Sequence, residues 1–114
     1  MNTRAAGAVA EEIAAKYLEK SGYEILERNY VSAGAEIDLV AVDGDTLVFA
    51  EVKSSSLPFG AAAERVNAAK RARYVRAAKA FVAARKAFGM NVRFDVMEIK
   101  PGGVNHIKGA FDAV

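Results

Sequence analysis

Two neighbouring apolar stretches of the chain carry charged residues at alternate positions. Glu36 and Asp38 are two residues apart in the first stretch, and Glu51 and Lys53 are two residues apart in the second. An Asp-Gly-Asp turn sequence at positions 43–45 predicts that the stretches form an antiparallel hairpin. A two-residue loop then places Asp38 opposite Glu51 and Glu36 opposite Lys53, all on one face because side chains alternate along a strand. The other face would be apolar, formed by Ile37, Leu39, Ala50 and Val52.

Carboxylates arranged in this way are suited to bind a divalent cation. Asp38 and Glu51 repel each other when they lie opposite in a strand pair, which destabilises the pair. Mg²⁺ or Mn²⁺ would remove the repulsion, since these cations take hard oxygen ligands, usually one or two carboxylates with water and substrate phosphate. The predicted metal ligands are Asp38, Glu51 and the main-chain carbonyl of Val52. Such a cation polarises a phosphate and activates a water, and Lys53 is expected to neutralise the charge that develops during the reaction.

The same residues also permit a purely structural interpretation. Glu36 and Lys53 would then form a cross-strand ion pair, and Asp38 and Glu51 would point into solvent. Spacing alone does not decide between the two interpretations, because Glu-x-Lys is common on strands and short motifs often match by chance.

The surrounding sequence predicts one α/β or α+β domain that spans residues 1–114. A chain of 114 residues has room for a single core. Apolar spacing and turn residues give the order αβββαβ, a mixed sheet flanked by helices. The expected helices run from about Asn2 to Ser21 and along an alanine-rich stretch that ends near Phe88, and the expected strands are Tyr23–Tyr30, Ala35–Val42, Thr46–Lys53 and Val92–Ile99. The tail from Val104 to Val114 would add a short strand or lie on the surface.

The first helix has an amphipathic pattern and carries two acidic residues near its middle. Glu11 lies at one edge of the expected apolar stripe and Glu12 at the other. Either carboxylate could reach the sheet, and the alternative is a pair of exposed acids that favour the helix dipole. The stripe expected to be buried consists of Val9, Ala10, Ile13, Ala14 and Tyr17.

Positive charge is concentrated in residues 61–88. This segment holds eight basic residues and one acid, although the whole chain carries only +2. A basic element beside an acidic remainder is typical of a phosphate-binding face next to a cation pocket. Lys70, Arg71 and Arg73 are the predicted nucleic-acid contacts. A solvated helix with long side chains is the alternative.

Composition excludes several other kinds of site. The chain contains no cysteine, which rules out disulfides, zinc sites with thiolate ligands and a cysteine nucleophile. Its longest apolar runs are far shorter than the roughly 20 residues of a membrane span. The first residues lack the apolar block of a signal peptide, so we expect a cytoplasmic protein without membrane contact. His106 is the single histidine, and a structural role is expected for it because a triad or zinc site would need further partners.

Several runs of the sequence together resemble a known family. They are Arg28-Asn29-Tyr30, Glu36-Ile37-Asp38-Leu39-Val40, Val48-Phe49-Ala50-Glu51-Val52-Lys53, Gly60, Lys70 and Arg93-Phe94-Asp95-Val96. In order and spacing, the chain resembles the YraN-like family of predicted endonucleases, which is itself similar to archaeal Holliday-junction resolvases. The resemblance implies a restriction-endonuclease-like fold with a carboxylate on the first helix, then an aspartate, then a Glu-x-Lys pair around a metal. These positions correspond here to Glu11, Asp38, Glu51 and Lys53.

The resulting hypothesis is a metal-dependent endonuclease that hydrolyses phosphodiester bonds in nucleic acid, with DNA, including branched DNA, as the expected substrate. A binding module on the same fold that cleaves weakly or not at all is the alternative. It is favoured by a departure from the family pattern, since Ser54, Ser55 and Ser56 stand where a basic residue often follows the Glu-x-Lys pair. Ala10 and Ala35 likewise replace glycines of the pattern. A homodimer is expected only by analogy with junction-cleaving enzymes, whose substrate has two-fold symmetry.

Overall fold

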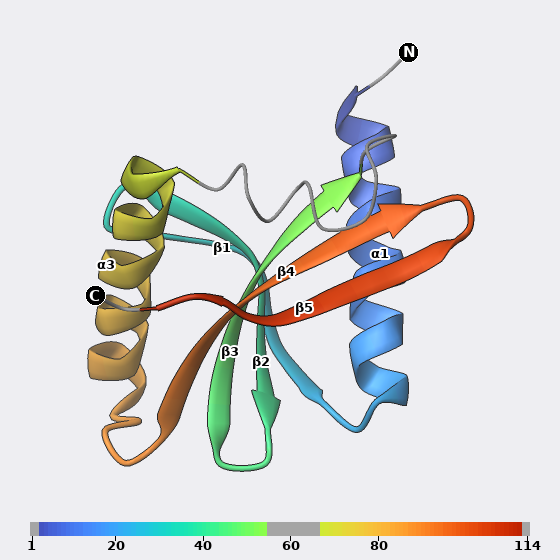
Figure 1. The fold of residues 1–114 in the computed structure, drawn as a ribbon. Coiled ribbons are helices and arrows are strands. Elements are labelled where there is room, and N and C mark those ends of the chain that lie inside the picture. The colour runs from blue at the N-terminus through green and yellow to red at the C-terminus, as the bar shows by residue number, and fades with distance from the viewer. Residues whose placement is uncertain (1–2, 55–66, 113–114) are drawn as a thin grey trace.

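The computed structural model describes residues 3–54 and 67–112, which form two helices and five strands. In chain order the elements are α1 (Thr3–Lys20), β1 (Glu24–Ser32), β2 (Ala35–Asp43), β3 (Thr46–Ser54), α3 (Ala68–Arg85), β4 (Asn91–Lys100) and β5 (Gly103–Phe111) (Figure 1). The predicted order αβββαβ is confirmed for these residues, and the tail adds β5 as a fifth strand. Residues 61–66, where the sequence predicts the start of the basic helix, lie outside the described part of the chain.

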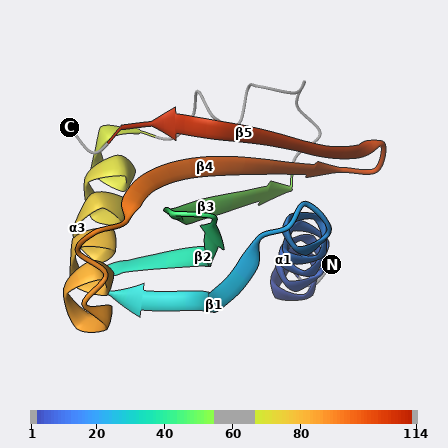
Figure 2. The same cartoon turned by 90° about the horizontal axis from the view of Figure 1, so that it is seen from below.

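The strands form one mixed sheet in the order β1-β2-β3-β4-β5. β3 and β4 are parallel, whereas each of the other neighbouring pairs is antiparallel. A parallel pair needs a long crossover, and the crossover between β3 and β4 contains α3. This helix covers one face of the sheet and α1 covers the other (Figures 1 and 2). The predicted α/β domain with a mixed sheet between helices is therefore confirmed. Neither described helix is long and apolar enough to cross a membrane.

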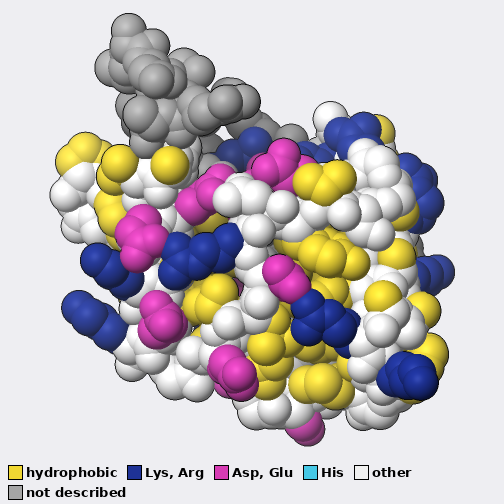
Figure 3. Space-filling view, turned by 180° about the vertical axis from the view of Figure 1, so that it is seen from behind, with side chains coloured by type: hydrophobic (Ala, Val, Ile, Leu, Met, Phe, Trp, Pro, Cys, Tyr) yellow, Lys and Arg dark blue, Asp and Glu magenta, His cyan; other side chains and the backbone are white. Residues whose placement is uncertain are grey.

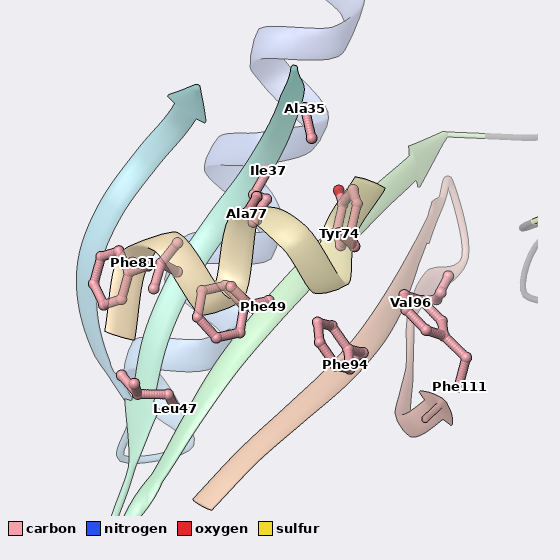
Figure 4. Close-up of a cluster of buried hydrophobic side chains, with 12 residues drawn as sticks. Ala35, Ile37, Leu47, Phe49, Tyr74, Ala77, Phe81, Phe94, Val96 and Phe111 are labelled. Carbon is pink, nitrogen blue, oxygen red and sulfur yellow. The ribbon is translucent and has the colours of Figure 1, made fainter. Parts of the chain in front are cut away.

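Each face of the sheet has its own apolar core. Beneath α3 the core is aromatic, with Phe49 of β3 at its centre and ring centroids 5.6 Å from Phe81 and 5.9 Å from Phe94 (Figure 4). Beneath α1 the buried side chains are mainly small or aliphatic, among them Leu39 and Ala50. Burial of a phenylalanine side chain contributes about 1.5–3 kcal/mol. The aromatic core therefore holds α3 firmly against β3, the strand that carries the Glu-x-Lys pair.

The buried face of α1 differs from the expected stripe. Ala10 and Ala14 are buried as predicted. Val9, Ile13 and Tyr17 are exposed by 59%, 42% and 38%, so their predicted burial is wrong. The physical reason is size: small side chains let the helix approach the sheet closely, and larger ones are displaced to its flank. The residues of α1 that are buried against the sheet are Ala10, Ala14, Ala15 and Leu18.

Candidate active site

The centre of the candidate site is a fork between β2 and β3. The two strands pair from Asp43 and Thr46 as far as Leu39 and Ala50, in the predicted register. Beyond this point residues 35–37 of β2 pair with β1, and residues 51–54 of β3 pair with β4. Figure 4 shows the two strands separating, with Tyr74 of α3 lying between their diverging ends. We call this divergence, at residues 35–38 of β2 and 51–54 of β3, the fork.

Asp38 lies where the pairing of β2 and β3 ends, and its side chain forms a further hydrogen bond between the two strands. Its Oδ2 accepts a hydrogen bond of 2.8 Å from the main-chain N–H of Val52. A half-buried N–H left without an acceptor would be costly, and the carboxylate supplies that acceptor across the opening strands. The backbone of β3 therefore holds Asp38 at the fork. The donor of this hydrogen bond, Val52, directly follows Glu51 in the chain.

The regular alternation of β2 breaks at Asp38. Ile37 is buried in the core beneath α3, whereas Leu39, two residues later, is buried in the core beneath α1. The prediction that Ile37 faces away from the carboxylates, with Leu39, is therefore wrong. The backbone of the neighbouring strand β1 is irregular at the same level. Asn29 of β1, between the paired positions Arg28 and Tyr30, has a φ of +51°. Asparagine tolerates this left-handed conformation better than most residues.

Glu51 is the most strongly bound side chain of the fork. Its side chain is only 6% exposed. Oε1 accepts a hydrogen bond from the ammonium of Lys70 and lies 3.1 Å from the ammonium of Lys53, while Oε2 accepts a hydrogen bond from the hydroxyl of Tyr74. Burial alone would raise the pKa of Glu51, but the hydrogen bonds from Lys70 and Tyr74 and the nearby positive charges hold it below its usual range. The carboxylate is therefore ionised and neutralised by the protein's own cations.

Asp38 has the opposite electrostatic character. Burial, and next the negative charge of Glu51, raise the pKa of Asp38 to about 7. The charge of Glu11 adds to this rise, while the N–H of Val52 and the charge of Lys70 oppose it. Two carboxylates whose pKa values are driven apart by their surroundings are a frequent feature of functional sites. Near neutral pH, the protonated and ionised forms of Asp38 are therefore both populated.

Lys53 pairs with a different carboxylate from the one that its position in the hairpin suggests. Because the ladder between β2 and β3 ends at Leu39 and Ala50, neither Asp38 and Glu51 nor Glu36 and Lys53 form a pair in it, and that part of the predicted register is wrong. Glu36 is exposed and pairs along the backbone with Val31 of β1 instead. Burial lowers the pKa of Lys53, but the charge of Glu51 outweighs it and raises the pKa above its ordinary value. Lys53 is thus a permanent ammonium at the fork.

The two acidic residues of α1, Glu11 and Glu12, interact with different parts of the structure. Glu12 forms ion pairs with Arg28 of β1 and, at 3.9 Å, with Lys16. Glu11 is half-buried and close enough to Asp38 for its charge to contribute to the raised pKa. Of the two candidates that the helical pattern left open, Glu11 is therefore the one that contributes to the electrostatics of the fork.

The three predicted nucleic-acid contacts occupy different surroundings on α3. Lys70 points into the site and binds Glu51. The guanidinium of Arg71 lies 5.7 Å from the ring centre of Phe111, and Arg73 is exposed. Figure 3 shows basic side chains along the right edge, formed by α3, and a mixture of acidic, basic and hydrophobic side chains over the remainder of that face. The basic character of the α3 edge is retained, with Lys70 turned inward.

Two residues of the site were missed as such in the sequence. Lys70 was assigned to the substrate surface, and Tyr74 was not assigned to the site. Tyr74 is 1% exposed, and burial and the charge of Glu51 raise its pKa above the usual range, so it remains a hydrogen-bond donor. Helical spacing carries the missing signal. Lys70 precedes Tyr74 by four residues and Ala77 by seven, which places it on the buried face of the helix.

The oxygen atoms of the fork fit a divalent cation. Asp38 and Glu51 are two carboxylates from adjacent strands whose charges act on each other, and Val52 offers a main-chain carbonyl between Glu51 and Lys53. In the described part of the chain no three His, Cys, Asp or Glu side chains gather as metal ligands. Mg²⁺ needs no such cage, because one or two carboxylates with water and phosphate are its usual ligands. The raised pKa of Asp38 supports the fit, since a cation would replace its proton.

A second polar cluster lies on the other face of the sheet. Asp95 of β4 is fully buried and binds Arg93 at 2.9 Å, His106 at 2.6 Å and the main-chain N–H of Gly109 at 3.0 Å. Burial raises the pKa of Asp95, but these partners outweigh it and hold the pKa below its usual range. Arg93 also binds the hydroxyl of Tyr23 at 2.7 Å. The cluster joins β4, β5 and the start of β1, in agreement with a structural role for His106.

Comparison with known proteins places the chain among uncharacterised proteins. A family model described as "Uncharacterised protein family UPF0102" matches residues 10–99. A UPF0102 protein of Caldicellulosiruptor saccharolyticus is 41% identical over 97% of this chain and 100% of its own length. A UPF0102 protein of Moorella thermoacetica is 42% identical over 97% of this chain and 98% of its own length. The solved structure of Pyrococcus furiosus SfsA in complex with Ca²⁺ is similar at 18% identity and a TM-score of 0.38, over 93% of this chain and 62% of that chain.

Proposed function

The chain belongs to the uncharacterised protein family UPF0102, the YraN-like group of predicted endonucleases, and we propose that it is a metal-dependent endonuclease that hydrolyses phosphodiester bonds in nucleic acid. Membership confirms the resemblance drawn from the sequence motifs. The activity goes beyond what membership gives, and its support comes from the fork.

One observation carries the proposal. Two carboxylates from diverging strands, Asp38 and Glu51, lie close enough for the charge of Glu51 to raise the pKa of Asp38, and Lys53 and Lys70 both pair with Glu51. Buried charges destabilise a fold unless they are paired, and a pair of them is hard to explain by stability alone. A site that must hold a cation and a phosphate needs both kinds of charge in one place.

Each residue has a distinct role in this proposal. Asp38 and Glu51 hold the cation, with the carbonyl of Val52 as a further donor. A bound Mg²⁺ or Mn²⁺ would supply Lewis-acid polarisation of the phosphate and a water of lowered pKa. Lys53 remains an ammonium and neutralises charge that grows on the phosphate oxygens in the transition state. Glu11 is the accessory carboxylate, placed to orient water on the α1 side of the fork.

The substrate would approach along α3. The sequence of this helix contains six basic residues and no acid, and its exposed members include Arg73 and Arg76. Phosphates are attracted to such an edge without regard to base sequence. DNA is the proposed substrate class, and the fork lies beneath the first turns of this helix, where Lys70 and Tyr74 reach Glu51.

Cleavage of a substrate panel tests the proposal. Labelled branched, nicked, linear and single-stranded DNA would be incubated with the protein and Mn²⁺ or Mg²⁺. Cleavage products are expected with metal, and none with a chelator. Asp38→Asn and Glu51→Gln should abolish both cleavage and the rise in melting temperature that the cation alone produces. Cleavage that survives in both variants would show that the fork is not the active site.

A binding module remains the second candidate because of two contacts of Glu51. Both oxygens of Glu51 already accept hydrogen bonds from the protein, from Lys70 and Tyr74. A protein that only binds nucleic acid could keep Glu51 in this state permanently. In that case the DNA panel would be bound and would raise the melting temperature, with no effect of the cation and no cleavage.

A further inference from the structure

One oxygen of the fork faces two ammonium groups. Oε1 of Glu51 accepts a hydrogen bond from Lys70 and lies 3.1 Å from Lys53. Two positive charges on a single carboxylate oxygen repel each other, and a divalent cation at the same carboxylate would add to that repulsion. Binding of the cation therefore favours the departure of one lysine from Glu51.

The two lysines reach Glu51 from different elements. Lys53 is on the same strand and the same face as Glu51, and its backbone is fixed against β4 by pairing with Glu98. Lys70 reaches Glu51 from another element, the first turn of α3, after the capping residue Asn67. The side chains of Lys70 and Lys53 are 29% and 38% exposed, so exposure does not distinguish them, but a withdrawn Lys70 stays on α3, where its long flexible stem reaches solvent and its ammonium can be hydrated.

We propose that Lys70 is an exchangeable internal cation: it neutralises Glu51 in the metal-free protein, withdraws when a divalent cation binds Asp38 and Glu51, and then contacts a phosphate of the nucleic acid. This inference rests on the proposed metal site. It makes the metal and the nucleic acid bind cooperatively, because the metal releases a positive charge that the substrate can use.

The surroundings of Lys70 suit its second position. Arg71 and Arg73 follow it on the same turn of α3, so a withdrawn Lys70 joins a basic edge. The first turn of α3 contains no acidic residue that would capture the released ammonium. Amide groups at the start of a helix also favour a nearby phosphate, which strengthens the same contact.

The first test uses titration calorimetry to measure the affinity for Mn²⁺ without nucleic acid. Lys70→Met should bind Mn²⁺ about tenfold or more tightly than the native protein, because a hydrogen bond between charged groups no longer has to be broken. Lys70→Gln, which retains a weaker donor, should show a smaller increase and guards against misfolding of the methionine variant. Lys70→Arg keeps a cation and Arg73→Met lies away from Glu51, so neither should raise the affinity.

The second test uses fluorescence anisotropy to measure the affinity for a short DNA duplex, once with Ca²⁺ and once with a chelator. Lys70→Met should weaken binding several-fold in Ca²⁺ and leave it unchanged in the chelator, where Glu51 holds the native lysine. Arg73→Met, the matched control on the same helix turn, should weaken binding equally in both conditions. Equal weakening by Lys70→Met in both conditions would show that Lys70 contacts phosphate without being released by metal.

The outcomes separate this inference from the proposed function. If Glu51→Gln abolishes Mn²⁺ binding but Lys70→Met lowers the affinity or leaves it unchanged, the metal site stands and the exchange of Lys70 is wrong. If the native protein binds no Mn²⁺, or if Glu51→Gln binds it as well as the native protein, the metal site and the exchange both fail.

Discussion

Replacement of Asp38 by asparagine should stabilise the metal-free protein at alkaline pH. The fork holds this carboxylate in a partly buried position beside the charge of Glu51, and both conditions disfavour its ionised form. An asparagine has nearly the same shape and keeps an oxygen for the N–H of Val52, but it carries no charge. Residues kept for chemistry commonly reduce stability in this way.

The size of the effect follows from the proton affinity of Asp38. Its pKa rises from 3.8 to about 7 in the folded protein. At about 1.4 kcal/mol for each tenfold change in proton affinity, the ionised form costs on the order of 4 kcal/mol. Because the pKa is raised on folding, the stability contributed by the protonated group is complete below about pH 4 and is lost as pH rises through about 7. The gain from asparagine should be about 2 kcal/mol or more, since its neutral oxygen accepts the Val52 N–H less strongly.

Urea unfolding with a chelator present measures the effect. The free energy of unfolding of the native protein and of Asp38→Asn should be nearly equal at about pH 4 and should separate in favour of the variant as pH rises to about 9. Asp112→Asn, at an exposed position, serves as the control for the loss of one surface charge. Stability curves of the native protein and Asp38→Asn that stay parallel across this pH range would refute the buried carboxylate pair.

Three further changes address catalysis, binding and the second polar cluster. Lys53→Met should lower the cleavage rate by on the order of a hundredfold while the calorimetric metal affinity does not fall; parallel losses in both would make Lys53 an affinity residue. Arg71→Met with Arg73→Met should flatten the salt dependence of DNA affinity by at most about two units, at roughly 0.9 for each phosphate contact; an unchanged slope would mean that DNA binds elsewhere. Asp95→Asn should cost about 3–5 kcal/mol of unfolding free energy, because Arg93 lies beside it without its buried anion; a loss in urea unfolding below about 1 kcal/mol would contradict this.

The hairpin could be predicted in residue detail because two local signals agree there. The Asp-Gly-Asp turn fixes a two-residue loop, with Gly44 at a φ of +60°, and the apolar period of two fixes the strands on either side. Pairing of Asp43 with Thr46 and of Leu39 with Ala50 follows from these signals alone. The extra strand β5 was less predictable, since its residues carry a weak pattern and its partner, β4, had to be known first.

The end of that pairing could not be predicted from local signals. Ile37 and Leu39 are both apolar and two residues apart, so alternation places them on one face, yet they are buried in different cores. The change accompanies the left-handed backbone of Asn29 in the neighbouring strand. Beyond Leu39 and Ala50, β2 stays paired with β1 and β3 stays paired with β4, so β2 and β3 separate. Such competition between partners is a tertiary effect, and it is what brings Asp38 to the N–H of Val52.

The buried side of α1 shows a related limit of sequence patterns. The expected stripe was chosen by the hydrophobicity of side chains on a helical wheel. By that criterion Val9, Ile13 and Tyr17 are more hydrophobic than the alanines. The sheet selects by shape as well, and the fully buried Ala14 and Leu18 fill the space beneath the helix. The helix itself was predictable from its period, but its rotation about its own axis depended on the surface against which it packs.

Lys70 shows how folding and metal binding constrain the same residue. The protein has to fold before it binds a cation, and a buried Glu51 without a counter-charge would oppose folding. Lys70 and Tyr74 remove that penalty from α3, which also fixes the helix against β3. The same ammonium then competes with the cation, so the metal affinity of the fork should be lower than two free carboxylates would provide. Nucleic acid offers the ammonium an alternative partner, and metal binding should therefore be tightest when the substrate is present.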